Sequence, residues 1–239
     1  MTASVLHIDD GNGGEIAVST RRSPKAKRVA LKVDPAKGGA ELVLPQNVSD
    51  KLARDFLFKN IGWLKSRLNN LPERVRFSAE TEISILGKPH VLRHDPTARR
   101  GVWQVGGTPS ELWASGDEAH LERRVTDFLK RELRAYIQPR AVDYAGELGR
   151  KPGRISIRDT RSRWGSCSSK GDLSFSWRLI LAPRDVLDYV VAHEVAHLVE
   201  MNHSRRFWAL VEQLHPNSQP ARSWLKRHGA LLHSYGKPA

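Results

Sequence analysis

The pattern H-E-x-x-H at residues 193–197 has the clearest capacity for chemistry in this chain. It lies in an apolar stretch whose periodicity predicts a helix from Pro183 to about Val199. On such a helix His193 and His197 lie one turn apart on the same face, so both imidazoles can bind one metal ion. Glu194 lies about 100° further around the axis and can take a proton from a water molecule on that ion. The spacing predicts a zinc hydrolase with Glu194 as its general base.

A catalytic zinc ion usually has three protein ligands and one open position, so a third ligand is needed. His203 is the candidate if the helix ends before it, because in a continuous helix it would lie about 15 Å from His193 along the axis. Asn202 tolerates a left-handed turn, and Ser204 is a good N-cap for a second helix. Glu212 on that second helix is an alternative ligand, and a purely structural role in the turn is the alternative for His203.

The surroundings of the motif bear on whether it binds a metal. Its helix is strongly apolar, and two imidazoles and a carboxylate would be costly to bury there without a partner. The alternative is a set of ordinary core or surface histidines beside a helix carboxylate. The apolar context favours the metal site.

A second polar run, Arg-Ser-Arg-Trp-Gly-Ser-Cys at residues 161–167, precedes the motif. It predicts a glycine-containing bend between two short strands. Arg163 and Ser166 are candidates for contact with a substrate carbonyl, carboxylate or phosphate, and Arg163 and Tyr189 are candidates for stabilising an oxyanion. The structural alternative is an arginine stacked over a buried Trp164.

Composition narrows the class of protein. The 239 residues contain one cysteine, Cys167, which excludes an intrachain disulfide and a zinc site built from several thiolates. Cys167 is a weaker candidate for a nucleophile. No apolar run is long enough to cross a membrane, and the first residues do not resemble a signal peptide. We expect a soluble, cytoplasmic protein.

The elements that must position these residues predict an α+β fold. Residues 15–45 predict a small antiparallel sheet, and residues 49–70 predict one amphipathic helix. A hairpin near residues 83–91, with glycine first in its turn, and two further strands complete a mostly antiparallel β domain over residues 1–116. The second predicted domain, residues 117–239, begins with a long helix that Pro139 must kink or interrupt. Two short strands and helices over residues 183–199, 204–215 and 218–232 follow.

The formal net charge of +13 raises the question of an anionic partner. The charge is +5 over residues 1–80, +1 over 81–150 and +7 over 151–239. A basic cluster near the first strands is a candidate nucleic-acid contact: Arg21, Arg22, Lys25, Lys27 and Arg28. The alternative is a solvated surface that keeps the protein soluble.

Several of these segments together resemble the YgjP-like metallopeptidase family, which looks related to the SprT and WLM zinc peptidases. They are RWGSC at 163–167, SWRL at 176–179, YVVAHEVAHL at 189–198, NHS at 202–204 with Phe207-Trp208, and RRSPKAKRVALKV at 21–33. The resemblance implies that His193, His197 and His203 are zinc ligands and that Glu194 is catalytic. It also implies a zincin-like catalytic domain, in which the active-site helix packs on a small sheet whose edge strand can hold a substrate peptide.

The histidine spacing equals that of the H-E-x-x-H-x-x-G-x-x-H zincins, but Glu200 stands where those have glycine. The turn before His203 therefore differs from the metzincin turn. Our hypothesis is a peptidase with one Zn²⁺ per chain, acting on a peptide or protein. The alternatives are a nucleic-acid-binding protein with structural zinc, a SprT-like protease recruited to DNA, and an inactive scaffold.

Overall fold

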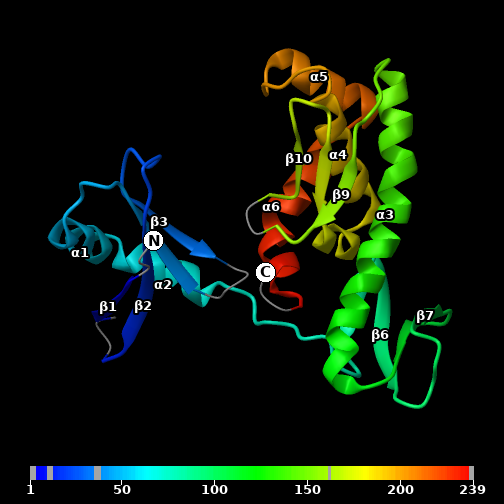
Figure 1. The fold of residues 1–239 in the computed structure, drawn as a ribbon, viewed down its shortest axis with the longest axis horizontal. Coiled ribbons are helices and arrows are strands. Elements are labelled where there is room, and N and C mark those ends of the chain that lie inside the picture. Colours follow the sequence, from blue (N-terminus) through cyan, green and yellow to red (C-terminus); the bar gives the residue numbers. More distant parts are fainter. Residues whose placement is uncertain (1–3, 10–12, 35–38, 161–162, 237–239) are drawn as a thin grey trace. The chain divides into compact units, whose positions relative to one another are not determined.

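The computed structural model describes residues 4–9, 13–34, 39–160 and 163–236 (Figure 1). The chain divides into two compact units, one ending at Glu73 and the other beginning at Arg74. Both units contain helices and strands, so the predicted α+β class is confirmed. None of the described helices is both long and apolar enough to cross a membrane.

The first unit combines a four-stranded sheet with two short helices. Its elements are β1 (Ser4–Asp9), β2 (Glu15–Arg22), β3 (Ala30–Asp34), β4 (Gly39–Leu44), α1 (Asp50–Lys59) and α2 (Ile61–Asn69). The strand order is β1-β2-β4-β3, and the two central strands run parallel. The sheet is therefore mixed rather than antiparallel as predicted, because apolar alternation reveals the buried face of a strand but not its neighbour.

The single helix predicted over residues 49–70 is divided at Asn60. The Ser49 hydroxyl accepts a hydrogen bond from the Leu52 amide and caps α1. Asn60 ends α1, and its Nδ2 donates to the Phe56 carbonyl at 2.7 Å. Asparagine competes for backbone groups in this way, which favours a break over a continued helix.

The second unit contains two sheets and the helices α3 to α6. The first sheet has the order β5-β6-β8-β7, from β5 (Glu82–Ile85), β6 (Lys88–Asp95), β7 (Val102–Val105) and β8 (Ser110–Ser115). The second has the order β10-β11-β9, from β9 (Ile155–Arg158), β10 (Gly165–Cys167) and β11 (Leu173–Ser176). The helices are α3 (Leu121–Glu147), α4 (Arg184–Ala196), α5 (Arg205–Leu214) and α6 (Gln219–Ser234), with the 3-10 turns η1 (Glu118–His120) and η2 (Trp177–Leu181).

The long helix α3 organises the second unit, in which it contacts α4, η2 and strands of both sheets (Figure 1). Its buried face carries Leu129, Leu133 and Ile137, all fully inaccessible to solvent. The helix continues through Pro139 to Glu147, whereas the sequence predicts a kink or an interruption there. The free energy gained by burying this face offsets the free energy lost with the backbone hydrogen bond that the proline removes.

The predicted domain boundary near residue 116 does not coincide with the division after Glu73. Strands β5 to β8 belong to the second unit, because Ile83, Leu92 and Leu112 join the same core as α3 and α4. The β5–β6 turn also differs from the prediction, since Leu86 and Gly87 both have positive φ and the glycine is second. The division after Glu73 therefore follows from which elements share a core, and strand patterns in the sequence do not show which elements pack together.

Candidate metal centre

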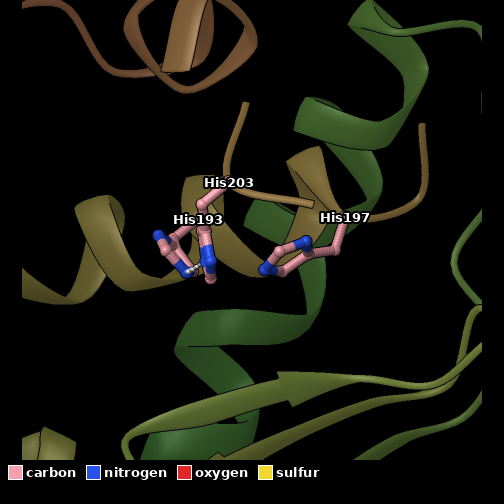
Figure 2. A group of neighbouring side chains, drawn as sticks. All are labelled: His193, His197 and His203. Carbon is pink, nitrogen blue, oxygen red and sulfur yellow. Dashed lines mark hydrogen bonds between the residues drawn. The ribbon is translucent and has the colours of Figure 1, made fainter. Parts of the chain in front are cut away.

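The helix α4 and the turn after it bring the three predicted histidines together. The helix begins after Pro183 and buries Val190, Val191 and Val195 against the core. His193 and His197 lie one turn apart, with His197 as the C-cap of α4. Figure 2 shows their rings on the same side of α4, with the His197 ring extending toward the other two.

His203 returns to this cluster because α4 ends before it. The Ser204 hydroxyl accepts from the Phe207 amide at 3.3 Å and caps α5, as predicted. Asn202 is not left-handed, and the described non-glycine residues with positive φ lie elsewhere. Nε2 of His203 lies 3.1 Å from Nε2 of His193, the contact drawn as a dashed line in Figure 2.

The three histidines form a donor set that fits a zinc ion. One ring nitrogen of each lies within 4.8 Å of the others. Nδ1 of His197 lies 3.0 Å from the Glu200 carbonyl oxygen, a contact that leaves Nε2 free for a metal. Glu200 stands where the H-E-x-x-H-x-x-G-x-x-H zincins have glycine, and it contacts His197 through its backbone carbonyl. Nδ1 of His193 is buried without a hydrogen-bond partner among the described residues.

Burial favours the neutral form of His193 and His197, which is the form that binds metals. Desolvation, with smaller contributions from His197, His203 and Arg222, lowers the pKa of His193 to about 4. Desolvation also lowers the pKa of His197, against the opposing effect of the Glu200 carbonyl. At neutral pH the His193 lone pair is therefore available.

Glu194 lies beside this cluster with its carboxylate buried, since the residue is 5% exposed. Desolvation raises the pKa of Glu194 to about 7, and the nearby Arg163 charge partly opposes the rise. A Cβ atom on Gly165 would lie 2.5 Å from Cγ and from Oε1 of Glu194. A carboxyl group with a pKa near neutrality can accept and return a proton at that pH.

The other predicted substrate contacts differ in their placement. Arg163 is exposed, and its charge partly opposes the rise in the pKa of Glu194. No cation–π contact between Arg163 and Trp164 is found among the described residues. Tyr189 is buried one turn before His193, with ring centroids 6.0 Å apart, and burial raises the pKa of its phenol. Ser166 follows Gly165 in β10, so its side chain projects from the face opposite to Glu194. The structure therefore does not bring Ser166 to the carboxylate.

Two other candidate residues are poorly suited to the roles predicted for them. The carboxylate of Glu212 accepts hydrogen bonds from the Asn217 and Ser218 amides and closes the turn after α5. It is not in the donor set, which counts against its use as the third ligand. Burial, followed by the Glu194 charge, raises the pKa of Cys167 to about 11, so this thiol is a poor nucleophile at neutral pH.

The basic cluster of the first unit is partly engaged within that unit. Arg21 pairs with Glu41 at 3.0 Å, and Arg22 pairs with Asp50 at 2.8 Å. Arg22 also donates to the Val48 carbonyl. The remaining predicted contacts, Lys25, Lys27 and Arg28, are exposed.

Sequence reasoning missed two residues of the site. The sequence predicts a bend at Gly165, and no pattern reveals that its missing side chain leaves room for Glu194. Arg222 on α6 lies 4.5 Å over the Trp208 ring, and Trp208 stacks on His203. The only sequence signal of Arg222 is a positive charge on an amphipathic helix, and such a charge is typical of any solvated helix face.

The chain is similar to one protein-family model and to one solved structure. A search of curated proteins finds no significant match. This chain is similar to the crystal structure of the metallopeptidase zymogen of Pyrococcus abyssi abylysin, with 23% sequence identity and a TM-score of 0.33. The match covers 39% of this chain and 93% of that chain. The family model of the YgjP-like metallopeptidase domain matches residues 27–228. This chain belongs to the YgjP-like metallopeptidase family.

Proposed function

We propose that the chain is a zinc-dependent peptidase in which His193, His197 and His203 hold one Zn²⁺ and Glu194 is the general base. The observation that carries the proposal is the approach of three imidazole nitrogens, one from each histidine, within 4.8 Å of one another. Two come from α4 and the third from the turn after it, which is the set that a three-ligand catalytic site requires.

The chemistry divides between the metal and the chain. Zinc supplies a Lewis acid that acidifies water and polarises a carbonyl. Glu194 takes the proton of the attacking water and passes it to the leaving amine, a transfer for which its pKa of about 7 is suited. Arg163 and Tyr189 are the proposed groups for stabilising the oxyanion.

A peptide substrate fits the strand next to Glu194. In the described chain β10 pairs with β11 alone, so its other edge has no neighbouring strand, and we propose that an extended peptide pairs there. Such an edge binds peptides through main-chain hydrogen bonds. Because Gly165 in the same strand lies against Glu194, a peptide paired with β10 would lie near the carboxylate.

DNA binding does not form part of this proposal. Arg21 and Arg22, two of the five basic residues predicted to contact nucleic acid, already pair with Glu41 and Asp50. A cytoplasmic location is consistent with the single cysteine.

Glu194→Gln tests the proposal. We expect purified wild type and Glu194→Gln each to hold about one zinc per chain, because the change leaves the ligands intact. Hydrolysis of a mixed peptide library should fall at least about a thousandfold in the variant. Glu200→Gln is the matched control, since Glu200 contributes its backbone carbonyl, and it should retain activity. A zinc-loaded wild type that cleaves no peptide would contradict the proposal.

A further inference from the structure

An arginine that the proposed chemistry does not use lies next to the histidine cluster. The guanidinium carbon of Arg222 lies 4.5 Å from the centroid of the Trp208 ring. Trp208 stacks on His203 with centroids 5.9 Å apart and meets His193 edge to face at 5.8 Å. One indole ring therefore contacts Arg222 and two of the proposed zinc ligands.

The Arg222 guanidinium is held in place but remains available. The residue is exposed, and no ion pair joins it to an acidic side chain within the described parts of the chain. A guanidinium over an aromatic ring keeps its N–H groups free at the edge of its plane. These groups match the two oxygens of a carboxylate.

The charges around the cluster favour an anion. Arg163 is exposed near Glu194, and Arg205 and Arg206 are exposed at the start of α5, directly after the His203 turn. The acidic residues nearby are Glu194, which is buried, Glu200 and Glu212, and they are fewer than Arg222 and these three exposed arginines. A site with an excess of one sign of charge attracts ligands of the other.

We propose that Arg222 binds a carboxylate of the substrate, so that this site selects peptides with a negative charge close to the cleaved bond. The proposal rests on the proposed peptidase function and names the substrate class of that same site. The carboxylate has two possible sources: the free C-terminus of a peptide, or an Asp or Glu side chain. The first source would make the enzyme a carboxypeptidase, and the second an endopeptidase with an acidic preference.

Three peptides distinguish these sources in a binding experiment. The zinc-loaded full chain with Glu194→Gln is titrated with acetyl-penta-alanine amide, with the same peptide bearing a free C-terminal carboxylate, and with the amide bearing a central aspartate. Dissociation constants are measured by calorimetry at low salt. We expect one charged peptide to bind about tenfold more tightly than the neutral one. Its identity names the source of the carboxylate.

Variants on the same helix test the assignment to Arg222. Arg222→Gln should abolish the advantage of the charged peptide, and Arg222→Lys should restore part of it because the charge remains but the planar fork is lost. Arg227→Gln is the matched control, since Arg227 is exposed on α6 about 140° around the axis from Arg222. It should retain the advantage.

The outcomes separate this inference from the proposed function. Equal binding of all three peptides, no binding of any, or an advantage that survives Arg222→Gln would overturn the role of Arg222. Cleavage of the neutral peptide by wild type at the same rate as the charged ones would overturn it while supporting the peptidase. Carboxylate-selective binding without any cleavage by wild type would support the role of Arg222 and contradict the proposed function.

Discussion

The Gly165 backbone in β10 lies against the side chain of Glu194 in α4, so closely that a Cβ atom would be 2.5 Å from both Cγ and Oε1. No side chain larger than hydrogen fits at this position without moving the carboxylate. The neighbouring Trp164 fastens the strand to α6, where its ring stacks on His233 with centroids 4.4 Å apart. The RWGSC run therefore places one face of strand β10 and the Glu194 carboxylate next to each other.

Gly165→Ala should separate metal binding from hydrolysis. The added methyl group must displace the Glu194 side chain, and a displacement of about 1 Å can cost about a hundredfold in rate. The zinc content should be unchanged because no histidine moves. Stability should fall by about 1–3 kcal/mol from overpacking.

The control for this variant is Gly146→Ala, because a Cβ atom on Gly146 in α3 would have no neighbour within 4 Å. Alanine there should leave peptide hydrolysis unchanged and stabilise the helix by up to about 1 kcal/mol. Hydrolysis rates, zinc analysis and urea unfolding check both variants. Full activity in Gly165→Ala would show that Glu194 need not occupy its observed position.

The histidine cluster was predictable because its geometry is local. The four-residue spacing of His193 and His197 needs only a helix, and the N-cap Ser204 requires the chain to turn before α5. The return of His203 follows from these two facts. The same reasoning predicted a helix start at Pro183, one residue before α4 begins.

The parts that sequence reasoning missed depend on contacts between distant segments. Gly165 and Arg222 reach the site from β10 and α6, and nothing in their local sequence records that approach. The mixed sheets and the boundary after Glu73 also depend on which strands become neighbours. Apolar periodicity predicts each helix or strand by itself, so it does not predict which elements become neighbours in the fold.

His203→Ala and Glu212→Gln together identify the third ligand. His203 lies 3.1 Å from His193, whereas the Glu212 carboxylate accepts the Asn217 and Ser218 amides. Zinc content should fall well below about one per chain in His203→Ala and stay unchanged in Glu212→Gln. The latter should lose about 1 kcal/mol of stability, because its turn loses charge-assisted hydrogen bonds. Elemental analysis without added metal measures the first effect, and the opposite ranking of the two variants would make Glu212 the ligand.

Alkylation should show that Cys167 is an unreactive thiol. Burial and the charge of Glu194 raise its pKa to about 11, so little of the reactive thiolate exists at neutral pH. The rate with iodoacetamide should rise about tenfold per pH unit until it approaches that pKa. Glu194→Gln should speed the reaction at a fixed pH below the pKa, because it removes a negative charge. The urea-unfolded protein is the control and should react as a free cysteine does; a rate that levels off near neutral pH in the folded protein would restore Cys167 as a candidate nucleophile.

Helix α4, which carries His193 and Glu194, also forms a polar contact with α3. Tyr136 donates its hydroxyl to Oδ1 of Asp188 at 3.0 Å, and Arg140 lies 3.5 Å from the same oxygen. Burial raises the pKa of Asp188, while the Tyr136 hydrogen bond and the Arg140 charge oppose the rise. Asp188 adjoins Tyr189 and lies one turn and a residue before His193, so the contact helps to position α4 behind the ligands.

Tyr136→Phe should destabilise the protein by about 1–3 kcal/mol at neutral pH, because the partly buried Asp188 carboxylate loses a hydrogen bond. The lost hydrogen bond favours the ionised form, so the pKa of Asp188 should rise further in the variant. The destabilisation should therefore be largest above that pKa and shrink as the pH falls through it, where the protonated carboxyl no longer needs the donor. Urea unfolding of Tyr136→Phe, Asp188→Asn and the double variant at neutral and mildly acidic pH measures the coupling. A cost for Tyr136→Phe that is the same at both pH values, or unchanged in the Asp188→Asn background, would show that the tyrosine acts through packing alone.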